Sequence, residues 1–184
     1  MITKQISLCN ASLLLLGASR IQSFEDGSAE SVIAEQFYER SYQALLSQYP
    51  WNFASKTKGL NRTTEEPGFE YKYEFQLPSD YVWIQRIYPN GDFKILGDKL
   101  HSNFKDVGVK YTWRVNEEMM PVHFEQAFIY YLASQMCISI TEDTTKQSTL
   151  YEQYMDEARR ARSLDAQMQP QDGFEDFPID TVRY

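Results

Sequence analysis

The spacing of apolar residues changes twice along this chain of 184 residues, and this change constrains the fold more than any other feature. Apolar residues recur every three or four positions toward both ends, as in amphipathic helices, but alternate with polar residues in the middle, as in strands. The helical pattern predicts helices over 3–16, 28–48 and 121–140, and a last helix that starts near Thr144 and extends past Ala161. The alternating pattern predicts strands over 69–76, 81–88, 92–96, 99–103 and 109–115.

The order of these elements predicts an α+β fold. We expect an antiparallel helical bundle of about four helices, an inserted antiparallel β-meander domain and an extended C-terminal tail. The expected bundle domain comprises 1–57 and 116–164, the inserted β domain 58–115, and the C-terminal arm 165–184.

Residues typical of helix ends and tight turns support these boundaries. Gly17 is expected to stop the first helix, and Asp26 or Ser28 to cap the second. Thr144 and Gln147 have the spacing of a capping box for the last helix. Two dipeptides with the composition of hairpin turns separate the later strands, Asn90-Gly91 and Gly97-Asp98.

The segment FEYKYEFQ, residues 69–76, shows the alternation most clearly. It predicts a strand with one aromatic and one charged face. The expected aromatic face consists of Phe69, Tyr71, Tyr73 and Phe75.

The net charge of −8 disfavours a protein that binds nucleic acid through its phosphates, because that mode relies on Lys and Arg. Cys9 and Cys137 both lie among apolar residues at helical spacing, so we expect reduced core residues rather than a disulfide. The apolar run 13–16 is too short and interrupted for a signal peptide, and no run is long enough to span a membrane. We expect synthesis in a reducing cytoplasm.

Motifs for catalysis are sparse. The sequence contains no glycine-rich phosphate loop, CxxC, HExxH or GxSxG. His101 and His123 are the two histidines, and His123 could act in a hydrolase with Glu125 or Glu118, although a histidine in a first helical turn is more often structural. No cluster has metal-ligand spacing. We therefore expect no metal, no cofactor and no enzymatic activity.

Adjacent carboxylates leave one enzymatic alternative open. Pairs occur at Glu65-Glu66, Glu117-Glu118 and Glu142-Asp143, and a cell-wall hydrolase of the glycosidase type could use such residues. Adjacent carboxylates in turns are usually solvated, and an acid catalyst needs a raised pKa that nothing in the sequence predicts.

The segment SQYPWNFASK, residues 47–56, lies where the helical pattern ends. Pro50 is expected to end the second helix because it lacks an N–H group. Trp51 and Phe53 follow, and this segment could be a binding loop, a hinge or an internal wedge. We favour a structural pin, formed by Pro50, Trp51 and Phe53, that fixes the β domain on the bundle.

Two further features suggest contacts with other proteins. Arg159, Arg160 and Arg162 form a basic cluster near the end of the last helix, where they either complement the helix dipole or dock an acidic partner. The acidic tail carries Phe174, Phe177 and Tyr184, and either folds back on the chain or inserts into another protein.

Four segments, taken in order, resemble the tail tubular protein A family, the head-to-tail adaptors of short-tailed bacteriophages. They are LCNASLLLLGASRIQSFEDGSAES (8–31), ALLSQYPWNFASK (44–56), YKYEFQLPSDYVWI (71–84) and YTWRVNEEMMPVHFEQAFIYYLASQMCISIT (111–141). The most specific parts are YPWNFA, the Leu-Pro-x-Asp-Tyr element at 77–81 and Met120-Pro121. The resemblance covers about residues 5 to 160 and fades beyond Leu164.

The resemblance implies a virion protein that forms a homo-oligomeric ring, usually a dodecamer, between the portal protein and the tail nozzle. Double-stranded DNA would pass through this ring without specific binding, and tail fibres could be further partners. The basic cluster and the aromatic residues of the tail would then be candidates for docking on the portal.

Overall fold

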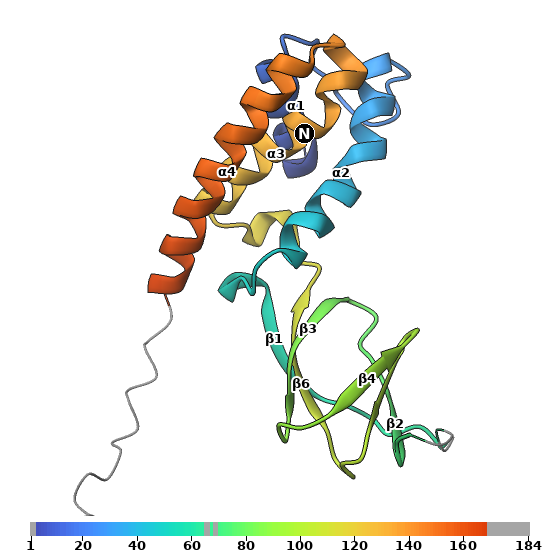
Figure 1. Ribbon diagram of the computed structural model, residues 1–184. Helices are drawn as coiled ribbons and strands as arrows, with labels where there is room; N and C mark the ends of the chain where they lie inside the picture. The colour runs from blue at the N-terminus through green and yellow to red at the C-terminus, as the bar shows by residue number, and fades with distance from the viewer. Residues whose placement is uncertain (1–2, 65–66, 68–69, 169–184) are drawn as a thin grey trace, which may run out of the picture.

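The computed structural model describes residues 3–64, 67 and 70–168, with helices at one end and strands at the other (Figure 1). The helices in this part of the chain are α1 (Lys4–Leu16), α2 (Ala29–Ser47), α3 (Val122–Thr141) and α4 (Thr144–Gln167), with short 3₁₀ helices η1 (Asn52–Ala54) and η2 (Glu117–Met119). The strands are β1 (Ser55–Gly59), β2 (Tyr73–Gln76), β3 (Tyr81–Tyr88), β4 (Phe93–Leu96), β5 (Lys99–Ser102) and β6 (Gly108–Trp113). The protein therefore mixes helices with antiparallel sheet, as the α+β prediction states.

The helix ends match most of the sequence signals. Gly17 adopts a left-handed conformation with φ of 76° at the end of α1 and donates its N–H to the carbonyls of the last turn. Ser28 caps α2, since its hydroxyl accepts a hydrogen bond from the N–H of Ser31 at 3.1 Å. The alternative cap, Asp26, instead accepts hydrogen bonds from Gln22 and Ser23 in the preceding loop.

The capping box predicted at Thr144 is wrong by one residue. Glu142 has a left-handed φ of 55°, so the chain turns sharply between α3 and α4. Asp143 is then the extended residue before α4, and its carboxylate accepts a hydrogen bond from the N–H of Lys146 at 2.9 Å. Asp is a better N-cap than Thr, which accounts for the shift. At its other end α4 continues to Gln167, so residues 165–167 of the predicted arm are helical.

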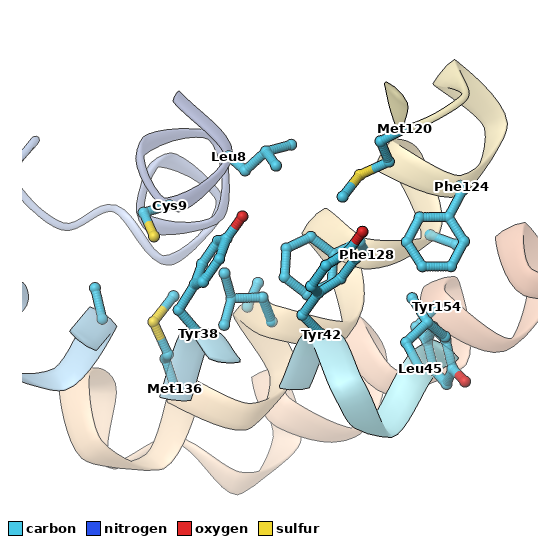
Figure 2. Packing of buried hydrophobic residues seen from close by; sticks show 14 of the residues in the cluster. Leu8, Cys9, Tyr38, Tyr42, Leu45, Met120, Phe124, Phe128, Met136 and Tyr154 are labelled. Carbon is cyan, nitrogen blue, oxygen red and sulfur yellow. The ribbon is translucent and has the colours of Figure 1, made fainter. Parts of the chain in front are cut away.

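Aromatic residues of α2 and α3 form the centre of the helical core (Figure 2). The rings of Tyr38 and Phe128 lie 5.4 Å apart, and those of Tyr42 and Phe124 lie 6.0 Å apart. Cys9 of α1 is fully buried beside them, and burial raises the pKa of its thiol to about 12. Cys137 is also buried and free, so the prediction of two core cysteines is confirmed.

The strands do not form the predicted single meander. They form two three-stranded antiparallel sheets, with the orders β1-β6-β3 and β2-β5-β4. Only β4 and β5 pair as neighbours in sequence, whereas β6 pairs with the distant β1 and β3. Turn dipeptides specify local hairpins, but burial of Val109 and Tyr111 favours a central position for β6. The prediction also missed β1, whose sequence SKTKG lacks alternating apolar residues.

The expected division of the 69–76 strand into aromatic and charged faces holds only in part. Phe75 is buried as predicted, but the neighbouring Glu74 is also buried. Its carboxylate lies 2.7 Å from Nζ of Lys99 and 3.1 Å from Nε2 of His101, both on β5. The hydrogen bond from Lys99 lowers the pKa of Glu74, so cross-strand pairing explains a buried charge that alternation could not predict. Phe69 lies outside the described residues.

A polar network ties the strands back to the helices. Arg114, which follows β6, donates to Glu39 of α2 and to Glu117 of η2 at 2.6 Å. Glu117 also accepts from Gln5 of α1 at 3.0 Å and from Tyr38 of α2 at 3.2 Å. Burial alone would raise the pKa of Glu117, but the hydrogen bonds from Arg114 and Gln5 outweigh it and lower that pKa.

Replacing Glu117 with Ala should therefore destabilise the protein by about 3 kcal/mol, because it leaves buried donors without their acceptor. Urea unfolding of the variant and the parent measures the difference. Glu118→Ala is the matched control, since Glu118 is the exposed neighbour in the same short helix and should change the free energy of unfolding by less than about 0.5 kcal/mol. Equal losses in both variants would contradict the role assigned to the network.

Candidate functional site

The chain passes from α2 into β1 through residues 49–55, a segment we call the junction. Trp51 is its largest fully buried residue. Its ring lies 4.9 Å from that of Phe124, in the first turn of α3, with an interplanar angle of 88°. Its indole Nε1 donates to the carbonyl of Leu45 in α2 at 3.1 Å. Trp51 therefore belongs to the helical core and connects α2 with α3.

The other two predicted pin residues lie nearer the surface. Phe53 is half-buried, and its ring contacts Phe124 at 4.9 Å. Pro50 is exposed and follows the C-cap Gln48 by two positions, so it lies just beyond the end of α2. The rings of Trp51 and Phe53 thus both pack against Phe124 of α3. That they fix the orientation of the strands stays a prediction.

Residues of the strands complete this seam from the other side. Val82 of β3 packs against the helical core, while Trp113 of β6 packs against both this core and the core between the sheets. Nζ of Lys56 in β1 lies 3.2 Å from the centre of the Trp113 ring, a cation–π contact. Trp113 is therefore the residue that links the two apolar clusters.

Asp165 of α4 is the residue of this site that sequence reasoning missed. It is buried, and its carboxylate accepts the N–H of Asn52 at 2.9 Å while its carbonyl accepts the Asn52 side-chain amide at 2.6 Å. Burial raises the pKa of Asp165, although the Asn52 hydrogen bond and the nearby His123 act in the opposite direction. These bonds fasten the junction to the end of α4 (Figure 1).

The signal for Asp165 was present in the sequence. Tyr154, Ala158, Ala161 and Asp165 occur at intervals of three or four residues and form the buried row of α4. Continuing this row by one turn would have placed Asp165 inside the core. The predicted arm instead begins at this residue, because the resemblance fades beyond Leu164.

The basic cluster divides into two parts. Arg159 and Arg160 are exposed and pair one turn back along α4 with Asp156 and Glu157, respectively. Such exposed pairs contribute little to stability. Arg162 instead lies over the ring of Tyr49, with its guanidinium carbon 5.8 Å from the ring centre. Arg162 therefore contacts the junction. Phe174, Phe177 and Tyr184 lie outside the described residues.

The family-like Leu-Pro-x-Asp-Tyr element also lies beside the junction. Asp80 accepts hydrogen bonds from Lys56 of β1 at 3.1 Å and from Tyr111 of β6 at 3.2 Å. Its main-chain carbonyl accepts the N–H of Arg114 at 3.0 Å. Burial alone would raise the pKa of Asp80, but the contacts with Lys56 and Tyr111 lower it. Asp80 thus joins the start of β3 to both other strands of its sheet.

Two of the candidate catalytic residues form ion-pair contacts within the fold. Glu125 pairs with Lys4 at 2.5 Å, and His101 faces the buried Glu74. His123 is half-buried, and its Nε2 has no hydrogen-bond partner within the described residues. The pair at 142–143 forms the turn between α3 and α4, while the pair at 65–66 lies outside the described part.

Within residues 3–64, 67 and 70–168, no group of three metal-ligating side chains comes together. None of the helices in the described part combines the length and apolarity that crossing a bilayer requires. Comparison of the sequence with models of protein families and with curated proteins gives no match. The site described above is thus a set of aromatic contacts and hydrogen bonds between the helices and the strands.

Replacing Trp51 with Ala should lower the free energy of unfolding by about 3 to 5 kcal/mol, because a fully buried ring is lost from the core. Chemical denaturation provides the measurement. Phe93→Ala removes a ring from an exposed edge strand and should cost less than about 1 kcal/mol. If Trp51→Ala cost as little as this control, the indole would not be a structural pin.

Replacing Asp165 with Asn should change how stability depends on pH. Because the folded state raises the pKa of Asp165, the native protein holds this proton more tightly than the unfolded chain does. The parent should lose stability relative to Asp165→Asn as the pH rises above 3.8, the ordinary value, until it passes the raised pKa. Thermal unfolding at a series of pH values measures this difference.

Asp26→Asn is the control with the opposite sign. Backbone hydrogen bonds from Gln22 and Ser23 lower the pKa of Asp26, so the parent should gain stability relative to this variant as the pH rises toward 3.8. The assignment for Asp165 fails if both variants show the same trend.

Proposed function

We propose that this chain is a structural subunit of the head-to-tail adaptor of a short-tailed bacteriophage. In this proposal, copies of the chain form a ring, a dodecamer in the family it resembles, between the portal protein and the tail nozzle. Double-stranded DNA passes through the ring without specific binding. The protein is made in the cytoplasm of the host and resides in the neck of the virion, where tail fibres are possible further neighbours.

The observation that carries the proposal is the position of the family-like motifs. YPWNFA forms the junction, Asp80 of the Leu-Pro-x-Asp-Tyr element anchors β3 beside it, and Met120 is buried in the helical core just before α3. These motifs are distant in sequence but meet where helices and strands join. Residues with this placement determine the geometry of a subunit, which matters most in a protein whose function is assembly.

The outer surface of α4 supports a role in assembly. α4 packs along α3 (Figure 1), and some of its apolar side chains are exposed. Tyr151 and Met155 are 46% and 41% exposed one turn apart, and Leu164 and Met168 repeat this arrangement near the end of the helix. The two pairs lie on opposite flanks of the buried row of α4, and exposed apolar pairs of this kind are typical of protein–protein contacts.

The net charge of −8 is compatible with a DNA conduit. A wall of like charge repels the phosphate backbone, so DNA would not adhere during ejection. The domain division proposed for the chain, a bundle interrupted by the β insertion and followed by the arm, would let the helices form the ring while the strands face tail components.

The alternative function, cell-wall hydrolysis, has weaker support. The lowered pKa of Glu117 is the opposite of what a general acid needs. One cleft of about 520 Å³ beside β2 contains the carboxylate of Asp98, but hydrogen bonds from Gln76 lower its pKa as well. Zymography of the purified protein on peptidoglycan tests this alternative, and a lytic band would revive it.

The adaptor proposal predicts a closed ring when the purified chain is mixed with the portal protein of the same virion. Electron microscopy and native mass spectrometry detect the ring and its subunit number. The double variant Tyr151→Glu and Met155→Glu should fold, because both residues are exposed, but should lose the ring through added charge in the contact.

Gln153→Glu is the matched control, since it adds charge to an exposed polar position of the same helix. It should leave the ring intact. A parent chain that stays monomeric even with the portal present would overturn the proposal. Deletion of 169–184, which spares Asp165, tests separately whether the arm contributes to portal binding.

A further inference from the structure

A polar cleft of about 370 Å³ lies between the junction and the sheet β1-β6-β3. The helical side contributes Tyr49, Asn52 and Ala166, the last of these near the end of α4. The sheet side contributes Trp83 and Arg86 of β3 and Lys110 of β6. The cleft therefore spans the same seam that the junction stabilises.

Three side chains of the sheet wall, Trp83, Arg86 and Lys110, have donors without an acceptor in the described part of the chain. Within the described part of the chain, neither Arg86 nor Lys110 forms an ion pair, and Nε1 of Trp83 is buried without a hydrogen-bond partner. The carboxylate of Asp165 does not line the cleft and accepts the N–H of Asn52 instead. Two cations and a buried N–H group suit a ligand that carries carboxylates.

The sequence that follows α4 has the complementary composition. Ala166 lines the cleft, and the residues after Met168 include one cation, Arg183, and several acids. The acidic residues are Asp172, Glu175, Asp176 and Asp180, and they alternate with the aromatic Phe174 and Phe177. An extended chain spans about 3.3 Å per residue, so Asp172 can reach roughly 20 Å from Ala166.

We propose that the cleft binds residues 172–180 of the same chain. Carboxylates of this segment pair with Arg86 and Lys110, Trp83 donates its N–H to an oxygen of the segment, and an aromatic ring packs near Tyr49. Nucleic acid phosphate is a poorer occupant, because two cations in a chain of net charge −8 give little attraction for a polyanion. This inference concerns the isolated protein and does not depend on the adaptor proposal.

Zero-length cross-linking of the full chain tests the proposal directly. A water-soluble carbodiimide joins an amine to a carboxylate only when the two are in contact. Peptide mass spectrometry should find Lys110 linked to Asp172, Glu175, Asp176 or Asp180. The yield should fall as salt is raised, because ion pairs at a partly exposed site are screened. Lys105 is the internal reference, since it is exposed and lies outside the cleft lining.

An equal mixture of light and ¹⁵N-labelled chains identifies which copy supplies the segment. Links within one chain, light to light and heavy to heavy, support the proposal. Links between light and heavy chains would overturn it in favour of a second copy. A Lys110 yield no higher than that of Lys105 would also overturn it.

Arg86→Gln should reduce the Lys110 link by about threefold, the effect of losing one partly exposed ion pair. Arg40→Gln is the matched control, because Arg40 is an exposed arginine of α2 outside the cleft. It should leave the yield unchanged. Equal effects of the two substitutions would mean that general charge, rather than the cleft, attracts the segment.

Discussion

The hydrogen bonds between Asn52 and the buried Asp165 join two parts of the chain that lie far apart in sequence. They fasten the segment leaving α2 to the last turns of α4, more than a hundred residues later. Trp51, the neighbouring residue, bonds to α2 and packs on α3. Three helices thus meet at two adjacent residues, and β1 begins immediately afterwards at Ser55. We therefore expect the placement of the strands relative to the helices to depend on this point.

A carboxylate is a costly means of making such a contact. Burial raises the pKa of Asp165, which shows that the fold disfavours its charged form even with Asn52 as a donor. An apolar side chain at this position would avoid the cost, but it could not accept a main-chain N–H and so could not specify where residue 52 lies. These hydrogen bonds therefore specify the position of residue 52 more than they stabilise the fold. Asp80 and Glu117 have the same role where the strands begin and end, each with several donors.

The sequence predicted what depends on local pattern and failed where distant residues decide. Helices α1 to α4 follow from apolar spacing and from Gly17 and Ser28, because these signals act within one turn. The pairing of β6 with β1 could not be predicted, since the segment 55–59 carries no apolar alternation and gains its partner only through the fold. At the site, the burial of Trp51 followed from its position after Pro50. The side chain of Arg162 packs over the ring of Tyr49, which belongs to a distant segment. The local sequence does not reveal this contact, so the prediction placed Arg162 in one cluster with Arg159 and Arg160.

The character of the junction favours an assembling subunit over an isolated binding module. Ring closure requires that each copy present two surfaces at a fixed angle, and small errors accumulate around the ring. A chain whose helices and strands were joined by a loose linker would satisfy this requirement poorly. Here the buried indole of Trp51 and the hydrogen bonds of the main-chain N–H and side-chain amide of Asn52 hold the segment between α2 and β1. In addition, Trp113 packs against both apolar clusters. These contacts do not involve the exposed Tyr151 and Met155 of α4, which the proposed ring would use for contact with a neighbouring copy.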